Sequence, residues 1–453
     1  MRVQTKTNQK YTTSESNSFK GGGFYNTTAE LENNIILSRA LIDLAGCDVP
    51  WVVMANNRHE RIERARRYSI VFVLAFLSPM ALLPVLNRIA MKNAGLTSKF
   101  WSNNHKAIHI SNENLVNVEK MKQGLEELAK KTSMGPFEVF YYKIMKKKPV
   151  EQKLDIKELL SLADEDDEKL RRKLINAKNG VLLADFLSSG IPLGCMGFIN
   201  NYLTKKKTGQ AGFSAELKMA DKNVIEKRAD SYEKNKYKRY AWFAALALGI
   251  STIFPLAVKH GLKSPAKKGV VKFIKNHSQL MDYKSGIYMS RWAFLFLMII
   301  NHGGLLLASR NKTEVKDTAI RMGTGDAIFF GGDLLLASIF ANLSDRLFGT
   351  KLREGGQTSF FSKIFPKTKP IKLVNKMVAD GSLELRNKKA ATSLYWLNLA
   401  ALAFSIGIVV PTIMNKVIRK DVNKDVEKEK THIKSNKPYF ETTKDKKAFK
   451  VFT

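Results

Sequence analysis

Cysteine is almost absent from this chain, which has only Cys47 and Cys195 among its 453 residues. Cys47 lies in a stretch whose apolar residues are spaced as in a helix, and Cys195 lies inside a long apolar run. Neither belongs to a cysteine or histidine pattern of the kind that holds a metal ion. We therefore expect no disulfide between the two cysteines and no metal site built on them.

Motifs for catalysis and cofactor binding are also missing. The sequence contains no Gly-x-Ser-x-Gly elbow, no glycine-rich phosphate loop, no His-Glu-x-x-His and no paired Cys-x-x-Cys. We therefore predict that the protein is not an enzyme and that it has no catalytic residues, no cofactor and no bound metal. The polar first 23 residues lack the apolar core of a signal peptide, so we expect an internal segment to direct membrane insertion.

Long apolar stretches are present instead, and six of them interrupt a chain that is otherwise rich in charge. In three of these stretches a tyrosine is followed after fifteen or sixteen residues by a proline: Tyr68 and Pro84, Tyr240 and Pro255, Tyr395 and Pro411. Basic residues precede the tyrosines, most closely Arg66, Arg67, Lys238 and Arg239. Aromatic and basic residues at the ends of an apolar helix anchor it at the membrane interfaces. We therefore predict that these tyrosines and basic residues are interfacial anchors.

These stretches predict an all-α fold, a polytopic membrane helix bundle of about six spans with an extramembrane helical insert. The predicted parts are a disordered N-terminal tail at 1–30, an amphipathic surface segment with an arginine cluster at 31–67, membrane span 1 at 68–90, a hydrophilic helical insert at 91–179, spans 2 and 3 with a basic loop at 180–262, spans 4 and 5 at 288–347, a basic loop at 348–389, span 6 at 390–420 and a lysine-rich tail at 421–453.

The formal net charge of +34 indicates an anionic partner. In a soluble protein such a charge suggests nucleic acid. Beside apolar spans, and without a nucleic-acid-binding signature, it indicates the anionic headgroups of a lipid bilayer, and we expect no nucleic acid partner. The insert at 91–179 is the expected surface for a protein partner.

The expected location is an integral membrane position, in the cytoplasmic (inner) membrane if the protein is bacterial. The positive-inside rule needs a difference between alternate loops, and here nearly all loops are basic. The arginine cluster before span 1 and the basic loop Lys205–Arg239 favour a cytoplasmic N-terminus. With six spans, both termini are then cytoplasmic.

Four polar residues within the spans form a candidate intramembrane site: Asp185, Asp333, His302 and Asn301. A charge at mid-bilayer costs about 2.5–3.5 kcal/mol on insertion scales, so such residues often line a substrate or proton pathway. The alternative is that the two aspartates serve helix packing or lie at the interface, because each is close to the start of its span.

Small residues in span 2 predict a close contact with another helix. Gly190, Gly194 and Gly197 are separated by four and three residues, and such spacing allows two helices to approach closely in lipid. Spans 2 and 5 each carry an early aspartate and each precede a tyrosine–proline span. Two three-span halves of inverted topology would be a transporter architecture. The alternative is that apolar helices resemble one another by composition.

The sequence therefore favours a non-catalytic multi-pass membrane protein with a scaffold, anchoring or lipid- or partner-binding role, whose basic surfaces face anionic lipid. The alternative is a secondary transporter or channel that uses Asp185, Asp333 and His302.

Overall fold

The computed structural model describes residues 22–33, 35–100, 102–130, 154–217, 219–265, 268–282, 290–353 and 385–435, and these residues form helices and no strand. The predicted all-α class is thus confirmed. The chain divides into two compact units, a small one made of 1–34 and 333–400 and a large one made of 35–332 and 401–453. Each is described by itself.

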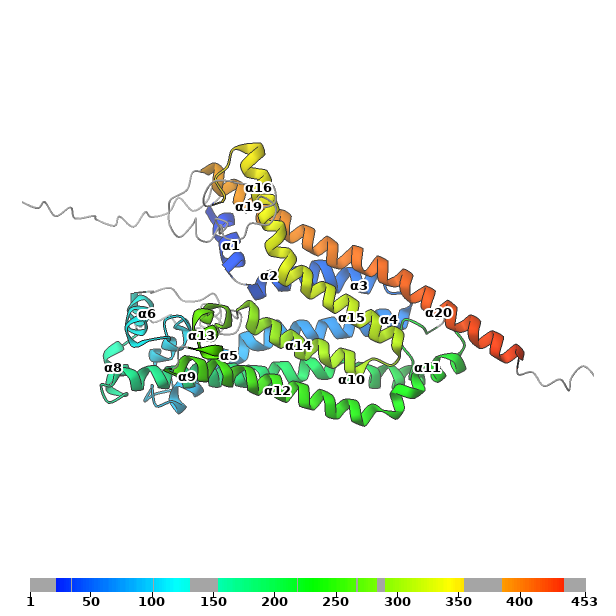
Figure 1. Ribbon diagram of the computed structural model, residues 1–453, viewed down its shortest axis with the longest axis horizontal. Helices are drawn as coiled ribbons and strands as arrows, with labels where there is room; N and C mark the ends of the chain where they lie inside the picture. The colour runs from blue at the N-terminus through cyan, green and yellow to red at the C-terminus, as the bar shows by residue number, and fades with distance from the viewer. Residues whose placement is uncertain are drawn as a thin grey trace, which may run out of the picture. The chain divides into compact units, whose positions relative to one another are not determined.

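The large unit is a bundle of long helices. Its main elements are α2 (Ile35–Ile42), η1 (Asp43–Asp48), α3 (Val49–Val53), α4 (Arg58–Phe72), η2 (Val73–Leu77), α5 (Ser78–Asn93), α9 (Asp167–Asp185), η4 (Phe186–Gly190), α10 (Ile191–Thr208), α12 (Lys236–Lys263), α14 (Arg291–Ala308), α15 (Lys312–Ala327), η6 (Ile328–Gly332), η7 (Ser405–Val409) and α20 (Val410–Ser435). Figure 1 shows α4, α10, α12 and α14 running side by side, with α10 packed against α14 and α4.

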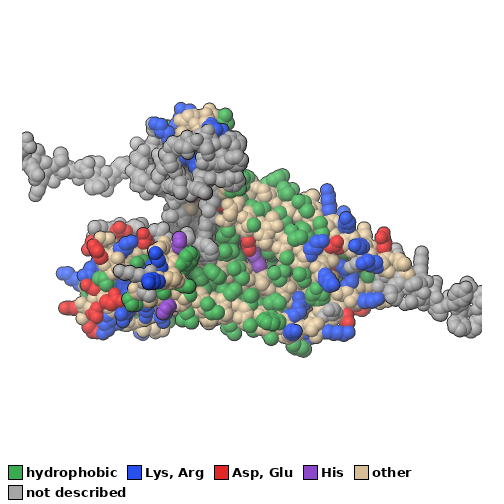
Figure 2. Space-filling model, viewed as in Figure 1, with side chains coloured by type: hydrophobic (Ala, Val, Ile, Leu, Met, Phe, Trp, Pro, Cys, Tyr) green, Lys and Arg blue, Asp and Glu red, His purple; other side chains and the backbone are tan. Residues whose placement is uncertain are grey.

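Among the described residues, four helices are long and apolar enough to cross a membrane: Arg58–Asn93, Asp167–Thr208, Lys236–Lys263 and Leu385–Lys424. A fifth is added if Lys312–Gly332 and Leu335–Phe348 count as one broken span, and the apolar helix Ala293–Ala308 is shorter. On the large unit, Figure 2 shows hydrophobic side chains gathered over the middle of the visible face, with charged side chains at both ends. This distribution is compatible with membrane integration.

Four turns of π-helix, η1, η2, η4 and η7, stand directly before prolines, which follow at the second residue after each turn: Pro50, Pro79, Pro192 and Pro411. A proline has no backbone N–H, and its ring displaces the carbonyl one turn earlier. A widened turn accommodates that displacement without ending the helix. The prolines are thus accommodated within continuous helical stretches.

The two predicted tails are partly helical in their described residues. Residues 22–30 belong to α1 (Gly22–Asn33), where the Phe24 ring stacks on Trp396 at 6.0 Å and the Thr28 hydroxyl accepts a hydrogen bond from the Trp396 indole at 3.1 Å. Residues 421–435 of the lysine-rich tail continue α20. The prediction missed these helices because average hydrophobicity does not register single aromatic contacts. The remaining parts of both tails, 1–21 and 436–453, lie outside the described residues.

The hydrophilic segment 91–179 has a small core of its own in its described part. It contains η3 (Asn103–His109), α6 (Val118–Lys130), α8 (Ile156–Ser161) and the start of α9. Met91, Leu115, Met121, Leu159 and Leu170 are completely buried there. Residues 131–153 of this segment lie outside the described residues.

The small unit contains α1, α16 (Asp333–Phe348) and most of α19 (Leu385–Phe404). Its buried cluster consists of Ala29, Ala341, Leu352 and Ala391. The Asp345 carboxylate fixes the turn after α16 by accepting hydrogen bonds from the backbone of Leu352 at 2.8 Å and the hydroxyl of Thr350 at 2.7 Å. Residues 354–384, which form most of the predicted basic loop, lie outside the described residues.

Candidate functional site

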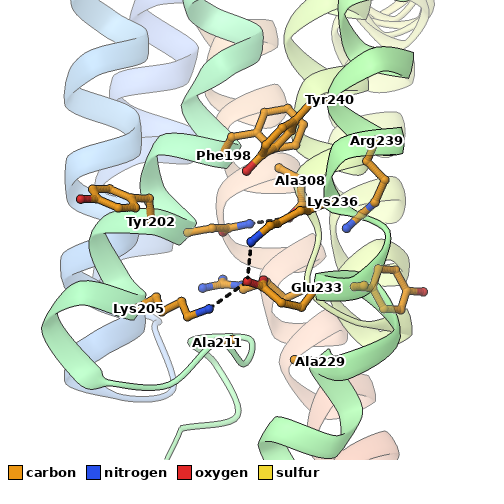
Figure 3. A pocket seen from close by; sticks show the side chains of 13 residues that line it. Phe198, Tyr202, Lys205, Ala211, Ala229, Glu233, Lys236, Arg239, Tyr240 and Ala308 are labelled. Atoms are coloured by element: carbon orange, nitrogen blue, oxygen red, sulfur yellow. Dashed lines mark hydrogen bonds and ion pairs between the residues drawn. The ribbon is translucent and has the colours of Figure 1, made fainter.

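A cavity of about 330 Å³ lies in the large unit where the end of α10, the helix α11 (Lys222–Lys234) and the start of α12 meet (Figure 3). Its walls combine basic, acidic and aromatic side chains: Phe198, Asn201, Tyr202, Lys205, Ala211, Ala229, Tyr232, Glu233, Lys236, Arg239, Tyr240, Ala308 and Arg310. Four basic side chains thus face a single carboxylate, so the cavity carries an excess of positive charge.

The carboxylate of Glu233 is the centre of the polar wall, and Figure 3 shows two lysines pointing toward it. Lys205 donates a hydrogen bond to Glu233 at 2.8 Å, and Lys236 donates one to the same oxygen at 3.3 Å. The bond from Lys205, together with that from Lys236, lowers the pKa of Glu233 below its usual value. Glu233 therefore holds two partly exposed ammonium groups, that of Lys205 near the end of α10 and that of Lys236 at the start of α12.

Aromatic side chains form the rest of the wall. The Phe198 ring meets Tyr240 edge to face at 4.8 Å, and the Arg239 guanidinium lies over Tyr232 at 4.8 Å. Tyr240 is 44% exposed and Tyr202 is 65% exposed. Exposed tyrosines beside basic residues at the ends of apolar helices are typical of the headgroup level of a bilayer.

Arg310 lies at the back of the cavity and is fully engaged by the protein. Its guanidinium donates to both oxygens of Glu63, at 2.9 and 3.1 Å, and to both oxygens of Glu314, at 2.8 and 3.0 Å. Burial opposes its charge, but Glu314 and Glu63 outweigh that effect and raise the pKa of Arg310. The positive charge available to a ligand is therefore that of Lys205, Lys236 and Arg239.

Two helices begin beside Arg310 with the same N-terminal cap. At the start of α4, the Asn57 side chain accepts from the backbone N–H of Glu60 at 2.9 Å, and at the start of α15, Asn311 accepts from Glu314 at 2.9 Å. The two glutamates accept in return from the N–H of the residue before each cap, both at 2.6 Å. This is a variant of the capping box, which satisfies donors that the helix leaves free.

Both capping asparagines also bond one short segment between α10 and α11. The Asn57 amide donates to the carbonyl of Ser214 at 2.8 Å, and the Asn311 amide donates to the carboxylate of Glu216 at 2.9 Å. Burial raises the pKa of Glu216, although Arg228 opposes this effect. This buried network fixes the helix ends around the cavity. In the sequence, the Asn-x-x-Glu spacing at 57–60 and 311–314 indicates the two helix caps that belong to this network.

The predicted intramembrane residues occupy separate surroundings. Asp185 is 1% exposed, accepts from the Ser189 hydroxyl at 3.1 Å, and has a second oxygen without a partner among the described residues. Asp333 belongs to the small unit and accepts from the Asn398 amide at 2.7 Å. His302 is paired with Asp326 at 2.7 Å. The prediction did not include Asp326.

The predicted packing glycines lie against α14, and Gly194 lies against α12 as well. A side chain at Gly190 would meet Leu297 and one at Gly197 would meet Ala308. A side chain at Gly194 would meet the ring of Phe243 on α12 and then the backbone of Ile300 on α14. The closest approach involves a fourth glycine, Gly304, where a Cβ would lie 2.1 Å from the carbonyl oxygen of Gly194. Small residues on both helices therefore allow α10 and α14 to touch through their backbones.

The predicted anchors differ in how much they are exposed. Tyr68 packs edge to face on Trp51 at 5.7 Å, and Arg67 pairs with Glu63 at 3.4 Å. Lys238 is exposed, as is Tyr240. Arg66 and Arg239 are partly buried. Tyr395 makes an edge-to-face contact with Trp396.

The sequence prediction missed Lys205, Glu233, Lys236 and Arg310 as members of one site, since they come from three separate places in the chain. Within the described ranges, no group of three histidine, cysteine or acidic side chains is arranged to hold a metal ion. No family model, curated protein or solved structure matches this chain. The site is therefore interpreted from its own chemistry.

Proposed function

We propose that the protein is a non-catalytic, multi-pass membrane protein whose basic cavity binds the headgroup of an anionic lipid. The observation that carries this proposal is the excess of basic side chains, Lys205, Lys236 and Arg239 against Glu233, beside exposed tyrosines at the ends of apolar helices. Each basic residue near an anionic membrane surface contributes about 1 kcal/mol to attraction. The adjoining cavity is a defined site in which one headgroup binds.

The finer membrane arrangement belongs to the same proposal. Six crossings result if the broken pair Lys312–Gly332 and Leu335–Phe348 and the shorter helix Ala293–Ala308 each cross together with the four longer helices. An even number of crossings places both termini on one side, which we propose to be the cytoplasmic side. The segment 91–179 then forms an extramembrane insert that is available to a protein partner.

Lipid binding tests the proposal directly. Purified protein is titrated with phosphatidylglycerol and with phosphatidylcholine, and bound lipid is counted by native mass spectrometry. We expect a preference for phosphatidylglycerol, and we expect the double variant Lys205→Gln/Lys236→Gln to weaken that binding by about tenfold or more, since it removes two charges worth about 1 kcal/mol each.

The matched control is Lys206→Gln/Lys207→Gln, which removes the same charge from exposed positions of the same helix end without altering the cavity wall. This control should change phosphatidylglycerol binding by less than about threefold. Equal losses in the two double variants would show attraction by bulk surface charge and would reject the cavity. The absence of any preference for anionic lipid would reject the proposal as a whole.

A secondary transporter or channel is the second candidate function. The observation that favours it is Asp185, a buried carboxylate in a candidate span with one oxygen unpartnered among the described residues. Such a residue often belongs to a proton or ion pathway. Proton movement into proteoliposomes that is lost in Asp185→Asn would favour this function, and unchanged movement would count against a role for Asp185.

A further inference from the structure

A second group of charged side chains lies inside the large unit, and none of its residues lines the cavity. His302 on α14 and Asp326 on α15 are its first members. The imidazole Nδ1 lies 2.7 Å from the Asp326 carboxylate, and the two side chains are only 12% and 17% exposed. Histidine is the side chain that proteins most often use to take up and release a proton, and here a carboxylate is bonded to its ring.

Arg39 and Asp43 form the other half of the group. The Arg39 Nε donates to the Asp43 carboxylate at 2.6 Å, and the guanidinium lies over the ring of Phe329 at 4.6 Å. Phe329 belongs to η6, which directly follows Asp326 and the end of α15. The charge of Asp326 also acts on Arg39. The two ion pairs therefore influence each other across α2 and α15.

Each of the two ion pairs contains a buried polar atom that makes no hydrogen bond among the described residues. The Nη1 of Arg39 and the Oδ1 of Asp326 are buried and have no hydrogen-bond partner among the described residues. The same holds for the Oδ1 of Asn301, next to His302. Buried polar atoms are nearly always paired, and unpaired ones call for an explanation such as a functional role.

The local backbone carries a second mark of function. Phe329 lies in η6, which, unlike the other π-helical turns of the described residues, is not followed by a proline. Such turns occur often at functional sites in helices. The position of η6 does not depend on the hydrogen bonds described above, and it therefore provides an independent observation.

We propose that His302, Asp326, Arg39 and Asp43 form a proton-binding site. The imidazole of His302 takes up one proton from solvent and becomes an imidazolium paired with the Asp326 carboxylate. That pairing neutralises the charge of Asp326, so the Arg39 guanidinium is then attracted by the Asp43 carboxylate alone. The occupied and empty states differ by one positive charge, and no other reactant is required.

Two further titratable groups lie beside the Arg39–Asp43 pair. Cys47 and Asp48 both interact electrostatically with Arg39 and Asp43. Burial, together with the charge of Asp43, raises the pKa of Asp48 to about 7. Asp48 is therefore a second group near this site whose charge changes near neutral pH.

The test is a titration of the full-length protein in lipid nanodiscs, with ¹⁵N-labelled histidine followed by NMR. The chain has seven histidines, and His302→Asn assigns the signal by removing it. We expect the His302 signal to move with pH, because the imidazole takes up a proton. Asp326→Asn should lower its midpoint by about one unit or more, and Arg39→Gln should raise it by about half a unit.

Asp164→Asn is the matched control, because it makes the same chemical change at an exposed carboxylate of the large unit. It should move the His302 midpoint by less than about 0.2 units. If Asp326→Asn does not fold, Asp43→Asn serves in its place and should also lower the midpoint. A His302 signal that does not titrate, or that shifts no more in Asp326→Asn than in Asp164→Asn, overturns the proposal. This outcome is independent of lipid binding at the cavity.

Discussion

A single side chain can supply the hydrogen bond that a proline removes from a helix. In η7, the backbone N–H of Val410 bonds the carbonyl five residues earlier, that of Ser405. By the same register Pro411 would bond Ile406, but proline has no N–H. The indole N–H of Trp51 bonds the Ile406 carbonyl instead, at 2.9 Å. A tryptophan from another helix thus completes a hydrogen bond that the sequence of this helix cannot make.

Replacing that tryptophan should therefore destabilise the protein. Trp51→Phe keeps an aromatic ring but leaves the buried Ile406 carbonyl without its donor, at a cost of about 1–3 kcal/mol. We expect a lower thermal unfolding midpoint in detergent. Trp242→Phe is the control, because Trp242 is 60% exposed, and it should change the midpoint little. Equal effects of the two substitutions would contradict the role given to the indole N–H.

At the scale of helices, close packing depends on where the glycines lie. Gly194 and Gly304 bring α10 and α14 into backbone contact, and Gly46 and Gly407 do the same for η1 and η7, where a Cβ on Gly407 would lie 1.8 Å from the Gly46 carbonyl oxygen. Without a hydrophobic force between helices in lipid, such contacts supply much of the association. Other glycines in the same bundle, such as Gly249, face open space.

This contrast predicts opposite outcomes for one kind of substitution. Gly304→Ala should push α10 and α14 apart and destabilise the protein by about 1–3 kcal/mol or more, because the new methyl group overlaps a backbone carbonyl. Gly249→Ala should be neutral or slightly stabilising, since alanine favours a helix by about 1 kcal/mol over glycine. Unfolding midpoints of both variants measure the difference, and similar midpoints would disprove the proposed contact.

At the scale of the whole molecule, an apolar surface separates charged ends. In the large unit the exposed apolar side chains include Leu248, Ile253 and Leu256 of α12, while the basic cavity lies at the start of the same helix. Exposed apolar surface of this extent is unfavourable in water and favourable in lipid. On the face that Figure 2 shows, the charged side chains of the large unit lie mostly outside this apolar band.

Membrane extraction tests this partition. After alkaline carbonate treatment of membranes that contain the protein, we expect it to stay in the pellet, because removing several apolar helices from lipid is far more costly than breaking surface ion pairs. A peripheral membrane protein serves as the control and should be released. Recovery of this protein in the supernatant, without aggregation, would refute membrane integration.

Apolar runs of about twenty residues were sufficient to predict an all-α protein with several helices long and apolar enough to cross a membrane, because a helix satisfies its own backbone within a continuous apolar segment. The Gly190-x-x-x-Gly194 spacing pointed to helix packing, and the structure places both residues against α14. Such features depend only on neighbouring residues, so the sequence alone can contain them.

The cavity and the buried ion pairs were decided by tertiary structure. Lys205, Glu233 and Arg310 come together only when α10, α11 and the start of α15 pack, and the partner of His302 lies 24 residues further along the chain. A buried charged side chain pairs with the opposite charge that folding brings close to it, because burial removes the water that would otherwise compete. The sequence therefore determined which segments are apolar helices, and the packing of those helices decided which polar groups meet.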